Sequence, residues 1–320
     1  METPISLGKI SGWEDMERNI LAKIFGMLNV IDIIKGASRV CVSWFLASHS
    51  KALWKTIDLS NIESVISENP YKVENLANDA ERQYELRNIL AEITKFNSSV
   101  TTNLVFDYNY YIQEEELAII APKMPNVKKL ALPLYRNLNE NSLMFTFSQW
   151  KNLQTLVITQ PHLPITKANF QAIGENCKSL TSLKLIRPLN TNLAEQLVSY
   201  FSNLKSLSFQ GASISKKSLL SLVTNHQNLR ILNLSHCLYI EFDGMPGDRN
   251  TMSVLDLHTE NLVQTATKKL DRFIVCSNHC GTCNVLWELF WSGWNFPYDY
   301  EYCTFSNKQW KTDEIEELQF

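Results

Sequence analysis

The chain lacks several features that mark large classes of protein. Glycine and proline number only ten each among 320 residues, which excludes collagen-like segments and long flexible linkers. No uncharged apolar run approaches the roughly 18 residues that a membrane-spanning helix needs. The formal net charge is −3, so the basic excess of a nucleic-acid or anionic-membrane surface is missing. We therefore expect neither a nucleic-acid partner nor a membrane partner.

The N-terminus and the cysteines indicate a reducing compartment. Residues 1–15 have no apolar stretch and carry Glu2, Glu14 and Asp15, which is unlike a secretory signal. Seven cysteines, an odd number, are most simply interpreted as reduced thiols. We expect a cytoplasmic or nuclear protein.

Motifs for catalysis and for cofactor binding are also missing. The sequence contains no G-x-G-x-x-G, no P-loop, no G-x-S-x-G and no His-Glu-x-x-His motif. None of the six histidines pairs by spacing with a candidate nucleophile, and we expect His236 and His258 to be surface or edge residues. The sequence predicts a protein without catalytic residues and without a cofactor.

What the sequence does contain is an internal repeat. An apolar-x-x-apolar-x-apolar hexad recurs at steps of 23 to 27 residues, and its copies end at Leu132, Ile158, Leu185, Phe209, Leu234 and Leu257. Two weaker copies precede them, over 54–59 and 104–106. The last apolar-x-apolar of each hexad has the period of a strand, and amphipathic stretches such as 194–201 and 217–224 have that of a helix.

A strand and a returning helix in 20–29 residues form a leucine-rich repeat, which must stack on its neighbours to bury its apolar face. We predict an α/β solenoid over 59–270 with parallel strands on the concave face and helices on the convex face. It has about 7–8 repeats, and residues 61–99 add a long helical segment. The alternative, a conventional α/β domain with unrelated strands, does not explain the near-constant spacing.

Residues 11–58 follow a different pattern, with three short apolar segments that predict three helices. This region resembles the F-box family in the residues Trp13-Glu14-Asp15-Met16, Ile20-Leu21, Ile24-Phe25, Leu28, Asp32, Val40-Cys41, Trp44 and Leu53 to Leu59. It departs from the family where Met16-Glu17 replaces the Leu-Pro that usually opens the motif. Proline at the first helical position is helpful but not essential.

An F-box followed by leucine-rich repeats is the layout of the F-box/leucine-rich-repeat family, and the length is similar to that of its short plant-type members. The resemblance implies the substrate adaptor of an SCF-type ubiquitin ligase, which binds a Skp-type adaptor and, through it, cullin and RING subunits. It also implies that Cys177 and Cys237 are small buried residues of their repeats. The alternative is a repeat scaffold, independent of any ligase, whose N-terminal helices only cap the array.

The resemblance identifies the residues that would face the adaptor. They are Met16, Ile20, Leu21, Ile24, Leu28, Val40, Cys41 and Trp44. The competing interpretation places these side chains in the core of the module. For Ile24 and Leu28 the two interpretations have equal weight.

The concave face is the expected docking surface for an unknown target protein. The residues that alternate with the inward leucines and would contact the target are Lys129, Thr155, Val157, Lys184, Ser208, Gln210, Asn233, Asp256 and His258. This row is mostly small and polar, so it lacks the aromatic anchors of typical interfaces. We expect Lys184 and Asp256 to provide charge complementarity and aromatic residues beyond 287 to provide burial.

Residues 271–320 break the leucine pattern, and we expect them to cap the last repeat. The aromatic residues there could instead form a partner-binding surface. We expect the acidic stretch 312–317 to be solvated. Zinc is possible at Cys276, Cys280, Cys283 and Cys303, with His279 nearby, because thiolates and imidazole suit tetrahedral zinc. Only one C-x2-C pair is present, however, so we expect free thiols and no metal.

Overall fold

The computed structural model describes residues 12–62, 76–107, 112–133, 139–159, 167–240, 261–276, 280–281, 283 and 311–320. Three predicted site residues, Asp256, His258 and Cys303, lie outside the described residues. The aromatic segment from Trp287 to Trp310 also lies outside them.

The N-terminal module consists of three short helices, as the sequence predicted. They are α1 (Arg18–Phe25), α2 (Val30–Lys35) and α3 (Val42–Ser48), with 3-10 turns at Trp13–Asp15, Ala37–Arg39 and Lys51–Trp54. The break at Asn29 is an N-cap, because the Asn29 side chain accepts a 2.8 Å hydrogen bond from the Asp32 backbone N–H. Leu21, Phe25, Ile33 and Ile34 are buried and join the core of the rest of the chain.

The predicted parallel sheet is present. Within the described residues it has eight strands in the order β1-β2-β3-β4-β5-β6-β8-β10, and every neighbouring pair is parallel. The strands are β1 (Thr56–Asp58), β2 (Asn103–Val105), β3 (Lys129–Leu132), β4 (Thr155–Thr159), β5 (Ser182–Ile186), β6 (Ser206–Ser208), β8 (Ile231–Leu234) and β10 (Arg272–Val275). The two weaker copies of the repeat form β1 and β2.

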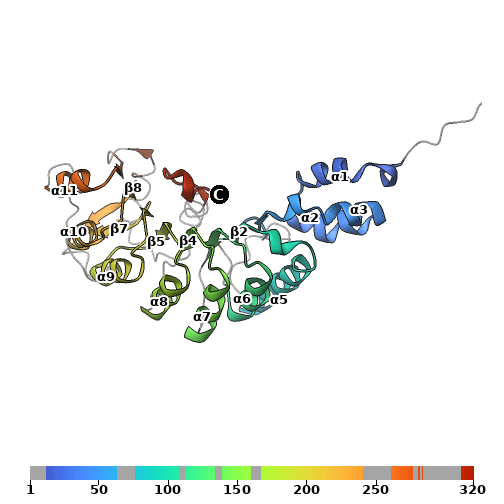
Figure 1. Ribbon diagram of the computed structural model, residues 1–320, viewed down its shortest axis with the longest axis horizontal. Coiled ribbons are helices and arrows are strands. Elements are labelled where there is room, and N and C mark those ends of the chain that lie inside the picture. The colour runs from blue at the N-terminus through green and yellow to red at the C-terminus, as the bar shows by residue number, and fades with distance from the viewer. Residues whose placement is uncertain are drawn as a thin grey trace, which may run out of the picture.

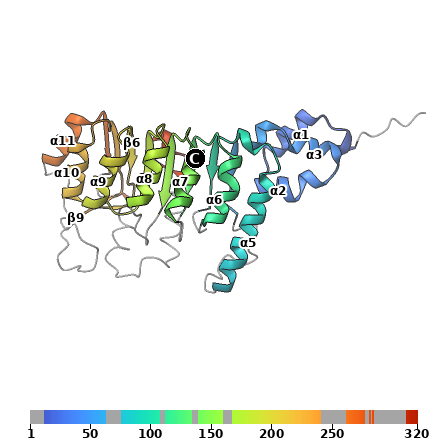
Figure 2. The same ribbon diagram turned by 60° about the horizontal axis from the view of Figure 1, so that its bottom comes forward.

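Helices cover one side of this sheet, which confirms the α/β solenoid (Figure 1). They are α5 (Leu76–Ile93), α6 (Glu114–Ile120), α7 (Glu140–Gln149), α8 (Lys167–Asn176), α9 (Thr191–Tyr200), α10 (Lys216–Asn225) and α11 (Asn261–Lys269). Figure 2 shows that α5, within the predicted helical segment 61–99, extends beyond the row of its neighbours. A second, two-stranded sheet pairs β7 (Ser213–Ser215) with β9 (Leu238–Ile240).

The alternation along the strands is the predicted one. Leu130, Leu156, Leu183, Leu207 and Leu232 occupy equivalent positions and are fully buried between sheet and helices. Asparagine side chains tie successive turns together. For example, Asn203 and Asn228 donate hydrogen bonds of 3.0 and 2.8 Å to carbonyl oxygens of the preceding repeat.

The C-terminal end of the sheet differs from the prediction. The 252–257 copy of the repeat lies outside the described residues, and the strand that pairs with β8 beyond β6 is β10. The sheet therefore extends past the predicted boundary at residue 270. Strand formation depends on pairing and packing as well as on the sequence pattern, and Arg272–Val275 lacks the leucine spacing of the repeat hexads.

The module and the array share a continuous core at their junction. The Trp54 ring is fully buried and stacks on Phe96 with ring centroids 4.5 Å apart. Its indole N–H donates to the Ser48 carbonyl at 2.7 Å, while Thr101 donates to the Trp54 carbonyl at 2.8 Å. Because these contacts connect both parts, the module is held in one orientation relative to the repeats.

Cys177 and Cys237 are buried repeat residues, as predicted. Their thiols donate to backbone carbonyls of the preceding turn, Cys177 to Phe147 and Trp150 and Cys237 to Phe209. Burial raises the pKa of each thiol to about 12, so both are neutral and unreactive at neutral pH. Among the helices that the structure describes, none is both long enough and apolar enough to cross a membrane.

Candidate functional site

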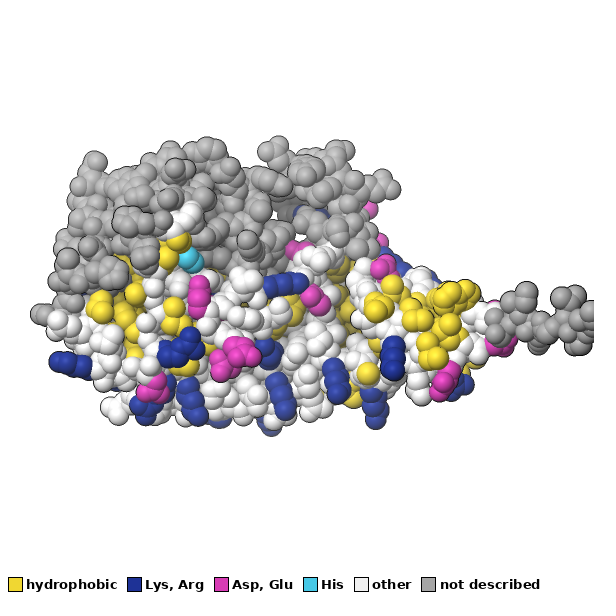
Figure 3. All heavy atoms as spheres, turned by 90° about the horizontal axis from the view of Figure 1, so that it is seen from above, with side chains coloured by type: hydrophobic (Ala, Val, Ile, Leu, Met, Phe, Trp, Pro, Cys, Tyr) yellow, Lys and Arg dark blue, Asp and Glu magenta, His cyan; other side chains and the backbone are white. Residues whose placement is uncertain are grey.

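The N-terminal module carries a large exposed apolar surface. We define the apolar module surface by its exposed large side chains, which are Trp13, Ile20, Met27, Leu28, Val40, Val42, Phe45 and Leu46. Figure 3 shows hydrophobic side chains gathered over this end of the molecule. A module with three short helices has little core, yet it leaves these side chains in water, which is the signature of an interaction surface.

The predicted adaptor-facing residues are mostly, but not all, on this surface. Ile20, Leu28 and Val40 are exposed, and Ile20 and Val40 have exposed fractions of 47% and 60%. Met16, Ile24, Cys41 and Trp44 are half-buried at its margin.

Leu21 corrects the prediction, because its side chain is fully buried in the core. On a helix, residues i and i+4 share a face, and Leu21 shares its face with the equally buried Phe25. The face of α1 that packs on the rest of the module therefore includes Leu21, and the neighbouring residue Ile20 points outward.

Trp44 connects the margin of the surface to the core. Its indole N–H donates a 3.2 Å hydrogen bond to the Trp13 carbonyl oxygen. Its ring packs edge-on against Phe25 and Trp13, with centroids 5.2 and 6.5 Å apart. These contacts hold the 3-10 turn at Trp13–Asp15 against α3, so Trp44 both supports the surface and contributes to it.

Sequence reasoning missed Trp13, Met27, Val42, Phe45 and Leu46 as surface residues. A signal for the last three was present. The segment from Val40 to Leu46 is apolar almost throughout, and a helix can turn only one stripe toward its own core. Some of its apolar side chains therefore had to face outward.

The concave face is occupied by the chain's own C-terminus. We call residues 311–320 the C-terminal tail, which includes a 3-10 turn, η8 (Glu316–Leu318). Figure 1 shows the tail, in red, on the side of the sheet opposite the helices. Ile315 and Leu318 are fully buried there against Val105, Ala131, Val157 and Ile186. The acidic stretch is therefore docked on the sheet through Asp313 and Ile315, while Glu314, Glu316 and Glu317 stay exposed, which corrects the expectation of a wholly solvated segment.

Lys184 is an internal partner of the tail. Its Nζ lies 3.1 Å from Asp313 Oδ2, and both side chains have 0% exposure. The same Nζ donates to Gln210 Oε1 at 2.8 Å and to the Thr312 carbonyl at 2.6 Å. Burial lowers the pKa of Lys184, and the nearby Asp313 carboxylate opposes that shift.

Other predicted target-binding residues complete this network. Ser208 and Asn233 donate to the two Asp313 oxygens at 2.6 and 2.8 Å, and Asn233 and Gln210 also donate to Glu314. Thr155 and Val157 are buried as well. These side chains, with Lys184, are bound within the chain and are not free to contact a target, which corrects the predicted docking surface.

The tail is also attached at its two ends. Lys129 donates to the Gln319 carbonyl at 2.6 Å, and its Nζ lies 4.8 Å from the centroid of the Phe320 ring. Burial lowers the pKa of Lys129, although Glu317 acts in the opposite direction. At the N-terminal side of the sheet, Lys311 forms a 2.9 Å ion pair with Asp58 of β1. The signal for a docked tail was the pair Ile315 and Leu318, which places two apolar side chains on one side of a tight turn.

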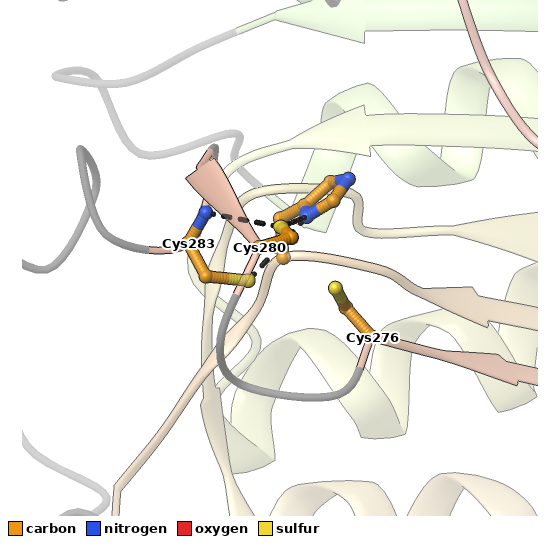
Figure 4. A group of neighbouring side chains, drawn as sticks. Cys276, Cys280 and Cys283 are labelled. Carbon is orange, nitrogen blue, oxygen red and sulfur yellow. Dashed lines mark hydrogen bonds between the residues drawn. The ribbon is translucent and has the colours of Figure 1, made fainter.

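A second cluster involves the cysteines of the C-terminal region. One donor atom from each of His236, Cys276, Cys280 and Cys283 lies within 4.8 Å of the others. Figure 4 shows the three labelled cysteines directed toward a common space. His236, which we had expected at the surface or an edge, takes the fourth position for which the sequence had suggested Cys303.

Known proteins resemble this chain along its whole length. A candidate F-box protein of Arabidopsis thaliana is 37% identical over 98% of this chain and 98% of its own length. An F-box/LRR-repeat protein of the same organism is 26% identical over 99% of each chain. A third, named as F-box/LRR-repeat protein 9, is 21% identical over 74% of this chain and 92% of its own. A comparison with protein-family models found no match.

Proposed function

Because the chain belongs to the F-box/leucine-rich-repeat protein family, we propose that it is the substrate-recognition subunit of an SCF-type ubiquitin ligase. In this role the N-terminal module binds a Skp-type adaptor, which links it to cullin and RING subunits. The repeat array holds a target protein. The free thiols of Cys41, Cys177 and Cys237 agree with a reducing compartment such as the cytoplasm or nucleus.

The observation that carries the proposal is the apolar module surface. Eight large apolar side chains remain exposed on a segment that spans only residues 13–46. Protein interfaces are built around such patches, and a single well-buried aromatic anchor contributes about 2–4 kcal/mol. Trp13 and Phe45 are the exposed aromatic side chains of this surface, so they are the proposed anchors.

The proposed adaptor contacts combine prediction and structure. Ile20, Leu28 and Val40 provide exposed contacts, and Met16, Ile24, Cys41 and Trp44 border them. Met27 and Val42 extend the same surface. Leu21 acts from inside, because it supports α1 from the core.

The junction supports a role in positioning a target for ubiquitin transfer. Trp54, Phe96 and Thr101 hold the module and the array in one orientation. A target bound to the array would therefore be held at a set position relative to the adaptor. Restricting the relative motion of two reacting groups is itself a large source of rate enhancement.

We place the target site on the tail-filled concave face. The outer side of the tail presents Glu316 and Glu317, which are exposed, while Asp313, Ile315 and Leu318 face the strands. A target would meet these carboxylates before it met the side chains of the strands. We therefore expect the target to offer basic groups, with the tail as a fixed part of the docking surface.

Co-purification with a purified Skp-type adaptor tests the adaptor proposal. Ile20→Asp and Val40→Asp should abolish binding, because each would place an unpaired charge in an apolar interface. Both positions are exposed, so both variants should keep the fold of the parent protein. Leu220→Asp is the matched control, because Leu220 on α10 has an exposed fraction of 44%, close to the 47% of Ile20.

The outcome separates the two functions that remain. Loss of adaptor binding in the module variants, with normal binding by Leu220→Asp, supports the ligase subunit. A full-length protein that never retains the adaptor would favour the ligase-independent scaffold. Unchanged binding in both module variants would move the adaptor site away from this surface.

A further inference from the structure

Three cysteines and one histidine from separate turns of the chain meet at the C-terminal end of the array. His236 lies in the turn after β8, and Cys276 directly follows β10, the strand that pairs with β8. Cys280 and Cys283 come shortly after. Two neighbouring strands thus deliver all four side chains to the same end of the sheet, in the space seen in Figure 4.

The four donor atoms lie close enough together to surround one tetrahedral metal ion. His236 Nδ1 lies 3.2 Å from Cys280 Sγ and 3.4 Å from Cys283 Sγ, and all four donor atoms lie within 4.8 Å of one another. With Zn–S near 2.3 Å and Zn–N near 2.0 Å, tetrahedral angles place neighbouring ligand atoms about 3.5–3.8 Å apart. We propose that His236, Cys276, Cys280 and Cys283 bind one Zn²⁺ as a closed structural site.

The backbone at His236 supports this assignment. His236 has φ of 60°, and it is the sole non-glycine residue with a positive φ in the part of the chain that the structure describes. This left-handed conformation is unfavourable for a residue with a Cβ, and glycine or asparagine usually fills such a position. The conformation turns the imidazole toward the three thiols, which gives a reason for histidine at this position.

The groups around the cluster are those that accompany a zinc site. While Nδ1 of His236 faces the sulfur atoms, Nε2 lies 3.7 Å from Glu314 Oε1. Histidine ligands commonly direct their second ring nitrogen toward a carboxylate, which sets the tautomer. The backbone N–H of Cys283 also approaches Cys280 Sγ at 3.3 Å, as expected for a hydrogen bond to a metal-bound thiolate.

The site would have a specific structural task. Glu314 belongs to the C-terminal tail and also accepts hydrogen bonds from Gln210 and Asn233. A metal that holds His236 therefore connects the end of the sheet to the tail.

The main competing chemistry is a disulfide. A disulfide would join two of the three thiols and leave the third with no function, and it needs no imidazole. None of the three forms a disulfide in the structure, and His236 approaches two of them. Thiolate and imidazole donors also favour zinc over Mg²⁺ and Ca²⁺, which prefer oxygen ligands. We therefore prefer zinc to the free thiols that the sequence alone suggested.

Metal analysis of the full-length protein tests the site directly. Protein purified under reducing conditions without chelator should contain one zinc per chain, and Co²⁺ exchanged into it should give the visible absorption of a tetrahedral thiolate site. Cys280→Ser and His236→Asn should each lower zinc affinity by more than about 100-fold. Asparagine is chosen because it tolerates the left-handed backbone at this position. Cys41→Ser, which removes a thiol far along the chain, should still contain one zinc.

Glu314→Gln provides a variant that keeps all four ligands. It should retain one zinc per chain but weaken zinc affinity by about 10–100-fold, measured by competition with a coloured chelator. If Cys280→Ser does not fold, this variant and chelator titration of the parent protein still give stoichiometry and affinity.

Three results would overturn the proposal. The first is parent protein that contains no zinc and takes up neither Zn²⁺ nor Co²⁺ when reduced. The second is a disulfide among the three cysteines, found by peptide mass in protein that was never reduced. The third is zinc content that Cys280→Ser and His236→Asn leave unchanged, which would indicate an adventitious ion only.

Discussion

The N-terminal module and the concave face of the array differ in which side chains they expose and which they bury. The module leaves large apolar groups such as Met27 and Val42 in water, whereas the concave face buries a lysine, Lys184, together with its carboxylate partner. Exposed apolar surface is unfavourable until a partner covers it. Buried charge is tolerable only because the partner is already present. The module thus has an apolar surface without a partner among the described residues of this chain, whereas the concave face of the array is already in contact with the C-terminal tail.

The largest expected effect comes from removing the ion pair between Lys184 and Asp313. Asp313→Ala should destabilise the protein by about 3–5 kcal/mol, because it leaves the ammonium of Lys184 buried without its carboxylate. The lower value applies if the tail detaches and admits water. Thermal unfolding measures the change, and Glu316→Ala, an exposed residue of the same tail, is the control. A stability equal to that of the control would show that Lys184 does not depend on Asp313.

Two adjacent residues of α1 sharpen the comparison from the module side. Leu21→Ala should cost about 2–5 kcal/mol through the cavity that it leaves, whereas Ile20→Ala should change stability by less than about 0.5 kcal/mol. Adaptor binding should show the opposite ranking once both proteins are folded. Chemical denaturation and a binding titration of the same preparations provide the two measurements. Equal losses of stability would contradict the assignment of Leu21 to the core.

Weakening the contacts of the tail should not affect adaptor binding by the module. Ile315→Ala together with Leu318→Ala should cost about 2–4 kcal/mol at most, because a tail that detaches locally limits the loss. Limited proteolysis should then cleave near Lys311 faster than in the parent protein, while adaptor binding stays unchanged. Protection equal to that of the parent would mean that the polar contacts alone hold the tail.

The smallest effect concerns the ion pair between Asp58 and Lys311. Burial acts to raise the pKa of Asp58, but hydrogen bonds from Ser60 and the Lys311 ammonium outweigh it and hold this pKa below its ordinary value of 3.8. A carboxyl with a lowered folded pKa stabilises the protein above its unfolded pKa, and this contribution disappears as pH falls through the folded value. The side chain of Asp58 is 48% exposed, so Lys311→Met should cost less than about 1 kcal/mol at neutral pH. The difference from the parent should vanish as pH falls below the folded pKa of Asp58, which unfolding curves across the acidic range can check.

Most of the fold could be predicted from local pattern. Helix and strand periods are properties of short segments, so the hexads located β3, β4, β5, β6 and β8 directly, and their spacing implied the parallel sheet. The strand β10 beside β8 was not predicted. Residues 272–275 have no leucine pattern, and pairing to β8 is a tertiary event that a pattern search does not detect.

The candidate sites were predicted less completely, for a related reason. Ile20 and Leu21 are both apolar and occupy consecutive positions on α1, but only packing against Phe25 and the rest of the module decides which one is buried. In the same way, the alternation along β5 predicts an exposed side chain for Lys184, and only the position of Asp313 in the tail buries it. The sequence separation of 129 residues between those two partners lies far outside any local pattern.

The sequence by itself determined the module, the repeat unit and the direction in which each strand turns its leucines, because all three depend on the apolar order of nearby residues. Only the tertiary structure decided that the tail fills the concave face and that His236 joins three distant cysteines. These contacts join residues that are far apart in the sequence, and they form only where the folded chain brings matching shapes and charges together. A linear pattern of residue types does not record such matching.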